Sequence, residues 1–163
     1  MLCDLSDLYQ KQKELDLEIA NNHHITYSST RNKRLLALLV ELGEFANTTR
    51  TFKFWSNKAM EEKAIVLDEF ADGLHFLLSL GIDQGYVVDT IEVEDDNLSL
   101  TDNLISTYEL VTNFYKDQTI QNYLKMFSSY LRALFKIGYE WNDAKNAYYL
   151  KCKENHVRQE NNY

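Results

Sequence analysis

Residues 34–47, RLLALLVELGEFAN, limit most strongly what this chain can fold into. Apolar side chains occupy most of the circumference of a helix drawn through this segment, so packing must surround it on most sides. Two carboxylates, Glu41 and Glu44, nevertheless lie one helical turn apart within it. A buried carboxylate without a partner is costly. The segment therefore predicts a packed helix with one narrow acidic strip whose charge must be balanced.

A second acidic pair lies in another apolar segment, at about 60–80. There Glu69 and Asp72 share a helical strip with Glu62, and the apolar Ile65 falls in the same sector. Antiparallel helices joined by a short connection pack side by side, so the two pairs can converge. Such carboxylates repel one another without counter-ions, and oxygen ligands suit Mg²⁺ or Mn²⁺ better than zinc. The predicted metal ligands are Glu41, Glu44, Glu69 and Asp72; the alternative is two ordinary solvated faces.

The fold class follows from the lack of chain-breaking residues. There is no proline and there are only five glycines in 163 residues, which favours long helices. The sequence predicts one all-α domain over residues 1–163, a helical bundle in which Gly81 ends the third helix. The segment 82–103 is the least helical, either a short extended stretch or, given its acidic cluster, a solvated mobile loop. Helices are expected at about 4–21, 30–47, 60–80, 101–116 and 118–137, and from Asn142 onward.

The charge of the chain restricts its partners. A net charge of −8 repels nucleic acid and anionic membranes, so neither is an expected partner. It would also repel nucleotide polyphosphates unless bound cations reverse the local field. Cys3 and Cys152 have no metal-site spacing, and neither a signal peptide nor a membrane-length apolar run is evident. We therefore expect a cytoplasmic protein.

Basic and amide side chains near the end of the sequence form a candidate phosphate site. Lys151, Asn155 and Arg158 are spaced i, i+4, i+7 and share one helix face. Lysine supplies a point charge and arginine a bidentate fork. Opposite the acidic residues, this face would hold a polyphosphate; the alternative is a polar terminal helix with scattered charges.

Gln12 lies in the middle of the apolar stripe of the first helix, with Asp16 beside it. Its amide either faces a cavity and hydrogen-bonds a ligand, or belongs to the edge of the core.

On these residues the sequence resembles the dimeric, all-α dUTPases, relatives of the MazG-like nucleotide pyrophosphohydrolases. Their signature is E-x-x-E, a spacer and E-x-x-D, present here as the two acidic pairs separated by twenty-four residues. The segments ELGEFAN, FKFWS with Trp55, and DGLHF with His75 match as well. The ending YLKCKENHVRQENNY is similar to the family's terminal motif, so the resemblance extends from the first helix to the last residue.

The resemblance implies a four-helix metal-site core, a homodimer and hydrolysis of dUTP, and of dUDP as well. Attack at the α-phosphorus of dUTP would release dUMP and pyrophosphate. Mg²⁺, or Mn²⁺ in its place, would activate the water. Glu44, or else Glu41, would orient or deprotonate this water, while Lys151 and Arg158 would neutralise the leaving group.

The resemblance also implies a base pocket. Gln12 would hydrogen-bond uracil and Trp55 would pack against its ring, whereas Asp16 aligns only loosely with an amide position of the family. His75 is either a pocket wall or a core histidine, and Tyr163 is a further candidate for contact with the substrate.

Three alternatives remain. A MazG-like pyrophosphohydrolase of another nucleotide would keep the chemistry and change the base. A ferritin-like di-metal oxidase requires two E-x-x-H pairs, and here only Asp72-x-x-His75 comes near that pattern. A non-catalytic module could bind a helical partner through its many aromatic side chains.

Overall fold

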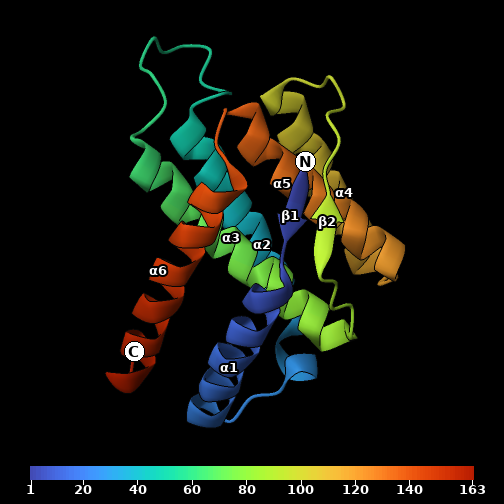
Figure 1. Cartoon of the computed structure of the whole chain (residues 1–163), viewed down its shortest axis with the longest axis vertical. Helices are drawn as coiled ribbons and strands as arrows, with labels where there is room; N and C mark the ends of the chain where they lie inside the picture. The colour runs from blue at the N-terminus through green and yellow to red at the C-terminus, as the bar shows by residue number, and fades with distance from the viewer.

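The computed structural model describes residues 1–163, which form six helices and one small two-stranded sheet (Figure 1). The prediction of an all-α fold is confirmed. No helix combines the length and the apolar character needed to cross a membrane. In chain order the elements are β1 (Leu2–Asp4), α1 (Ser6–His23), α2 (Tyr27–Thr49), α3 (Lys63–Gln84), β2 (Thr90–Glu92), α4 (Leu100–Lys116), α5 (Ile120–Lys136) and α6 (Trp141–Glu160).

The leucine-rich segment lies within α2, which starts three residues earlier than predicted. Thr26 and Ser29 form a capping box there, in which the Thr26 hydroxyl accepts from the Ser29 backbone N–H. This pairing satisfies donors that every helix start leaves free. Leu38, Leu42 and Phe45 are fully buried at helical spacing, so one face of α2 joins the core.

The central helix is α3, which packs against α1, α2 and α6 (Figure 1). The prediction that Gly81 ends this helix is wrong: α3 continues to Gln84, and Gly85 takes the left-handed conformation at its end. A Cβ on Gly81 would lie 2.2 Å from the Tyr123 hydroxyl oxygen. Glycine is needed at position 81 because an aromatic residue of α5 packs directly against the helix backbone.

The core joins the two halves of the bundle. Phe70 of α3 stacks on Tyr130 of α5 at 4.5 Å between ring centres, and Phe45 of α2 meets the Phe70 ring edge-on at 5.3 Å. The Tyr130 hydroxyl donates to the Phe70 carbonyl at 2.8 Å. Helices α4 and α5 pack on each other and support the α2–α3 pair from one side.

The sheet joins distant parts of the chain. Strands β1 and β2 run antiparallel, with Cys3 opposite Ile91. The first helix therefore starts at Ser6 and not at residue 4, because residues 2–4 are extended.

Part of the segment 82–103 is ordered by contacts with other elements. It includes β2 and the last turn of α3, and its Asp95 and Asp96 both form ion pairs with Lys136 at 2.9 Å. Ser99 then caps α4, its hydroxyl accepting from the Asp102 backbone N–H. The mobility predicted for this segment stays a prediction.

Candidate active site

A cavity of about 500 Å³ lies between α1, α2, α3 and α6, and it lies in the size range of small-molecule sites. No residue of α4 or α5 lines it. Eight of the residues that the sequence singled out come together in its wall: Gln12, Asp16, Glu41, Asp72, His75, Asn155, Arg158 and Tyr163.

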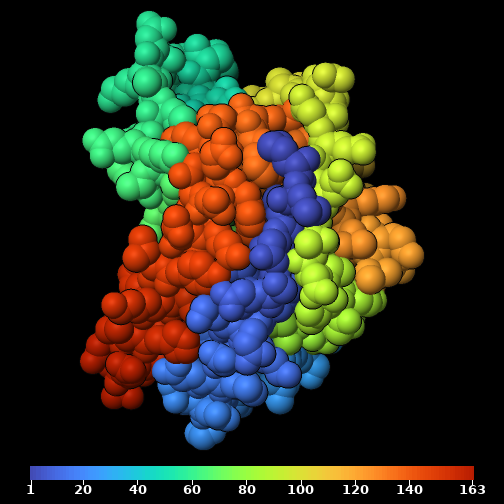
Figure 2. Space-filling view, viewed as in Figure 1, coloured from blue at the N-terminus to red at the C-terminus, as the bar shows by residue number.

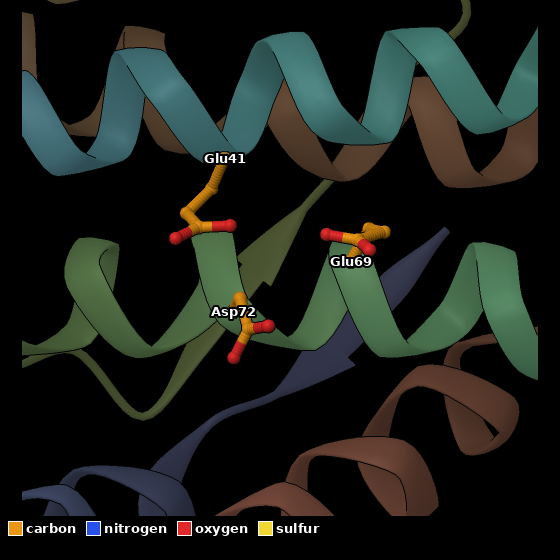
Figure 3. A group of neighbouring side chains, drawn as sticks. All are labelled: Glu41, Glu69 and Asp72. Atoms are coloured by element: carbon orange, nitrogen blue, oxygen red, sulfur yellow. The ribbon is translucent and has the colours of Figure 1, made fainter.

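Three carboxylates converge at one end of the cavity, where Glu41 and Asp72 line its wall and Glu69 lies beside them (Figure 3). Glu41 projects from α2, and Glu69 and Asp72 project from the facing side of α3, one helical turn apart. One oxygen from each lies within 4.8 Å of the others. All three are half-buried. This acidic cluster can hold a metal ion, because its hard oxygen donors are of the kind that Mg²⁺ and Mn²⁺ prefer.

The pKa values of the acidic cluster reflect the burial of its carboxylates and their mutual repulsion. Burial, together with the charges of Asp72 and Glu44, raises the pKa of Glu41 to about 7. Burial and neighbouring carboxylates also raise the pKa of Glu69. Proximity of like charges disfavours ionisation, and a bound cation would reverse this effect.

Glu44 lies beside the acidic cluster, but it is exposed and is not part of the close group of three. Its charge contributes to the raised pKa values of both Glu41 and Glu69. The structure thus brings three of the four predicted metal ligands together and leaves the fourth at the edge.

Lys151 is almost completely buried and does not line the cavity. Its ammonium group forms ion pairs with Asp72 at 2.9 Å and with Asp68 at 2.8 Å. The predicted phosphate ligand is therefore tied to one of the predicted metal ligands. Burial raises the pKa of Asp72, and hydrogen bonding to Lys151 opposes this shift.

The opposite end of the cavity is polar and internally hydrogen-bonded. The Asp16 carboxylate accepts from the Gln12 amide at 2.9 Å, from the Tyr27 hydroxyl at 3.0 Å and from the Ser79 hydroxyl at 2.8 Å. The Arg34 guanidinium lies over the Tyr27 ring, 4.8 Å from its centre. Burial raises the pKa of Asp16, while these donors and Arg34 oppose the shift.

His75 and Gln12 form a second part of this polar end. The Gln12 side-chain oxygen is 2.6 Å from His75 Nδ1 and accepts from the Tyr148 hydroxyl at 3.0 Å. The His75 ring stacks on Tyr148 with 4.2 Å between ring centres. His75 is buried and also lines the cavity, but it is not a satisfied core histidine, because its Nε2 has no hydrogen-bond partner; its contact with a base stays a prediction.

Helix α6 supplies the remaining wall. Asn155 and Arg158 are hydrogen-bonded to each other at 3.4 Å, and the Arg158 guanidinium lies 5.2 Å from the centre of the Tyr163 ring. Arg158 also pairs with Glu154. An arginine and an amide thus face the cavity on the side opposite α2.

Trp55 lies outside the cavity, in the connection 50–62 that protrudes at the upper left of Figure 2. It is 65% exposed, and its ring packs edge-on against that of Phe54. Within one chain Trp55 is not part of the wall that Gln12 and Asp16 share.

The sequence interpretation missed Tyr27, Arg34 and Ser79, which all line the cavity. A signal for two of them was present. Arg34 precedes Glu41 by seven residues and Ser79 follows Asp72 by seven, so each lies on the same helix face as a predicted ligand. Asp68, the second partner of Lys151, is four residues before Asp72 and could have been found in the same way.

The fold and the cavity define a class of protein: an all-α scaffold that combines an acidic, cation-type site with an arginine on the opposite wall. Such a combination suits a substrate that carries phosphate groups.

The chain belongs to the dUTPase family, whose model matches residues 4–163. It is thus a nucleotide-binding hydrolase, a dUTP diphosphatase. No curated protein matches the chain significantly.

Proposed function

We propose that the chain hydrolyses dUTP, and dUDP as well, by metal-dependent attack of water at the α-phosphorus, with dUMP and pyrophosphate as the products from dUTP. The observation that carries this proposal is the convergence of Glu41, Glu69 and Asp72 within 4.8 Å, with Glu41 and Asp72 in the wall of a cavity of about 500 Å³. Mg²⁺ is the proposed ion, with Mn²⁺ as a substitute. When bound, it supplies Lewis-acid activation of the water and neutralises phosphate charge.

The chain's own residues would divide the remaining work. Glu44, exposed at the edge of the acidic cluster, would join the ligands and orient or deprotonate the attacking water, with Glu41 as the alternative base. Arg158 and Asn155 would bind phosphate oxygens from α6. Lys151 would neutralise part of the charge on the same phosphates while its ammonium group stays close to Asp72. Gln12, Asp16 and His75 would form the wall against the base, and Tyr163 would cover the substrate.

The proposal includes a homodimer in the cytoplasm. Free cysteines suit a reducing compartment. The exposed aromatic residues Phe54 and Trp55 and the exposed apolar residues Leu36 and Val40 of α2 are candidates for the subunit contact. In a dimer, Trp55 would reach a base only in the partner's cavity or after movement of its own connection. Light scattering during gel filtration measures the mass and checks the dimer.

The experiment that tests the proposed reaction is pyrophosphate release from dUTP, dCTP, dTTP and UTP, with Mg²⁺ and with EDTA. Wild type is compared with Glu44→Gln and Glu69→Gln. Glu109→Gln, an exposed change on α4, is the matched control. We expect Mg²⁺-dependent release that strongly prefers dUTP, lost in the two site variants and kept in the control. Release that persists in EDTA would rule out the metal-dependent mechanism.

A MazG-like activity on another nucleotide would show as a preference for a different triphosphate in the same assay. No turnover of any of the four would favour a binding role without catalysis.

A further inference from the structure

One buried nitrogen in the cavity wall has no hydrogen-bond partner. His75 is 5% exposed, and its Nε2 atom is unpaired. Leaving a buried polar atom unpaired costs about 1–3 kcal/mol, so such an atom in a native structure calls for an explanation. His75 lines the cavity, so a ligand bound there can supply the missing partner once it reaches Nε2, an atom with almost no accessible surface in this structure.

The proton on the His75 ring is located by its neighbour. Burial, together with the charges of Lys151 and His156, lowers the pKa of His75 to about 3, so the ring is neutral and carries one proton. Nδ1 is 2.6 Å from the Gln12 side-chain oxygen, which can only accept. The proton therefore resides on Nδ1, and Nε2 carries a lone pair.

The orientation of the Gln12 amide is in turn set by Asp16. The Gln12 nitrogen donates to one Asp16 oxygen at 2.9 Å, and the other Asp16 oxygen accepts from the Tyr27 and Ser79 hydroxyls. Reversing the amide would place its oxygen against the carboxylate, with no hydrogen between them. The Tyr148 hydroxyl lies 3.0 Å from the Gln12 oxygen and 3.2 Å from the Leu8 carbonyl oxygen and can donate its one proton to either, so the amide orientation rests on Asp16.

We propose that Asp16, acting through Gln12, holds His75 in its Nδ1-protonated form, so that the cavity wall offers Nε2 as a hydrogen-bond acceptor for the N3–H group of a uracil base. Asp16 and Gln12 are positioning residues in this arrangement, and His75 is the residue that touches the base. This inference rests on the proposed function, since it assigns the base to the polar end of the same cavity.

The arrangement discriminates between bases by the direction of one hydrogen bond. Uracil has a donor at N3, which pairs with a lone pair, whereas cytosine has an acceptor there, which leaves Nε2 unpaired and repelled. A mismatch of this kind costs roughly 10-fold to 100-fold or more in kcat/KM. Thymine has the same N3–H group as uracil, so His75 does not exclude it.

The first test needs no nucleotide and is independent of the proposed function. Nitrogen-15 NMR of histidine-labelled protein distinguishes a protonated from an unprotonated ring nitrogen, and the His75→Phe variant assigns the signals. We expect a protonated Nδ1 and an unprotonated Nε2 for His75. The opposite tautomer would overturn the proposal even if dUTP were hydrolysed as expected.

The second test adds dUMP or dCMP to the labelled protein. We expect dUMP to shift the His75 Nε2 signal toward that of a hydrogen-bonded nitrogen, and dCMP to leave it unchanged. Binding of dUMP, seen by calorimetry, without a shift of Nε2 would refute base recognition by His75. Failure of dUMP to bind would count against base recognition by His75, whereas the proposed function is tested separately by pyrophosphate release from dUTP.

The third test is kinetic. In Asp16→Asn the new amide can donate to the Gln12 oxygen, so the Gln12 amide can reverse. Its nitrogen would then donate to His75 Nδ1, and the ring proton would move to Nε2, which becomes a donor. We expect the preference for dUTP over dCTP to fall about 10-fold to 100-fold, mainly through KM for dUTP. Glu14→Gln, exposed on the same helix, is the control for loss of one charge.

His75→Phe keeps a ring against Tyr148 and removes the acceptor, so it covers the case in which Asp16→Asn does not fold. An unchanged preference for dUTP in whichever variant folds would contradict the proposal.

Discussion

The carboxylates at the two ends of the cavity differ in the partners that the protein gives them. At the polar end one carboxylate, Asp16, accepts hydrogen bonds from three protein donors. At the acidic cluster, Glu41, Glu69 and Asp72 face one another, and their one close cationic partner is Lys151, on Asp72. The Asp16 carboxylate is satisfied by protein donors, whereas burial and the neighbouring carboxylates of the acidic cluster raise the pKa of Glu41 to about 7.

The two ends of the cavity therefore have different roles. A carboxylate that the protein satisfies fully can fix the orientation of its neighbours, because moving any of them would leave a buried group unpaired. Carboxylates that the protein leaves unsatisfied store unfavourable energy, which a cation can relieve on binding. A substitution at the polar end should therefore reduce stability, and one at the acidic cluster should reduce activity while relieving repulsion.

The largest expected effect comes from Glu69→Gln. Losing this ligand should lower kcat/KM for dUTP about 10³-fold, since a metal contributes several kcal/mol to the transition state. The same change removes a repelling charge, so the melting temperature in EDTA should rise. Stopped assays of pyrophosphate release and thermal melts check the two effects. A variant with reduced activity and a lowered melting temperature in EDTA would contradict the contrast between the two ends.

Asp16→Ala should act in the opposite way on stability. It leaves the Gln12, Tyr27 and Ser79 donors without their acceptor, which should lower the free energy of unfolding by about 2 kcal/mol. Urea unfolding in EDTA measures this effect. Glu69→Ala serves as the matched change at the other end. An equal loss of stability in both variants would contradict the expected difference between the polar end and the acidic cluster.

Lys151→Met tests the link between the acidic cluster and the phosphate side. Without the ammonium, Asp72 loses its competing cation, so Mn²⁺ should bind roughly 10-fold more tightly in the absence of nucleotide. Turnover of dUTP should nevertheless fall about 10-fold to 100-fold, because a charge near the leaving group is lost. Electron paramagnetic resonance of free Mn²⁺ reports the binding. Lys153→Met, exposed on the same helix, is the control; weaker Mn²⁺ binding in Lys151→Met would count against competition at Asp72.

The smallest expected effect is the pH dependence of stability in EDTA. Glu41 has a pKa of about 7 in the folded protein and near 4.5 as an unperturbed group, so the folded state binds more protons between these values. The free energy of unfolding should therefore fall as pH rises from about 5 to about 7. Glu41→Gln should flatten this fall, and saturating Mg²⁺ should reverse it. Thermal melts at a series of pH values measure how stability depends on pH in the two proteins. Identical profiles for wild type and Glu41→Gln would show that Glu41 is not the cause of the pH dependence.

The acidic cluster was largely predictable, because it depends on periodicity alone. The pairs around Glu41 and Glu69 each recur at one helical turn, and two antiparallel helices bring such faces together. The partner of Lys151 was not predicted. The sequence places Lys151 on a suitable helix face, but only the packing of α6 on α3 decides that its ammonium meets Asp68 and Asp72.

Other features depend on distances between elements that sequence spacing does not contain. The sequence predicts Gly81 as a helix end, whereas the close approach of Tyr123 from α5 explains the glycine. Trp55 was assigned to the base pocket through the resemblance, and within one chain it lies outside the cavity. Strand β1 is too short to give a period-two pattern, and its pairing with β2 is decided by the fold around it.

The pairing of β1 with β2 also has a consequence for the order of folding. More than half of the chain separates the paired residues Cys3 and Ile91, whereas α2 and α3 are neighbours in sequence. Closing so long a loop costs chain entropy before the ladder returns any hydrogen bonds, so local helix pairs form first. The ladder is then a late event, and protection of the Cys3 amide from hydrogen exchange would report that the segment from β1 to β2 has closed.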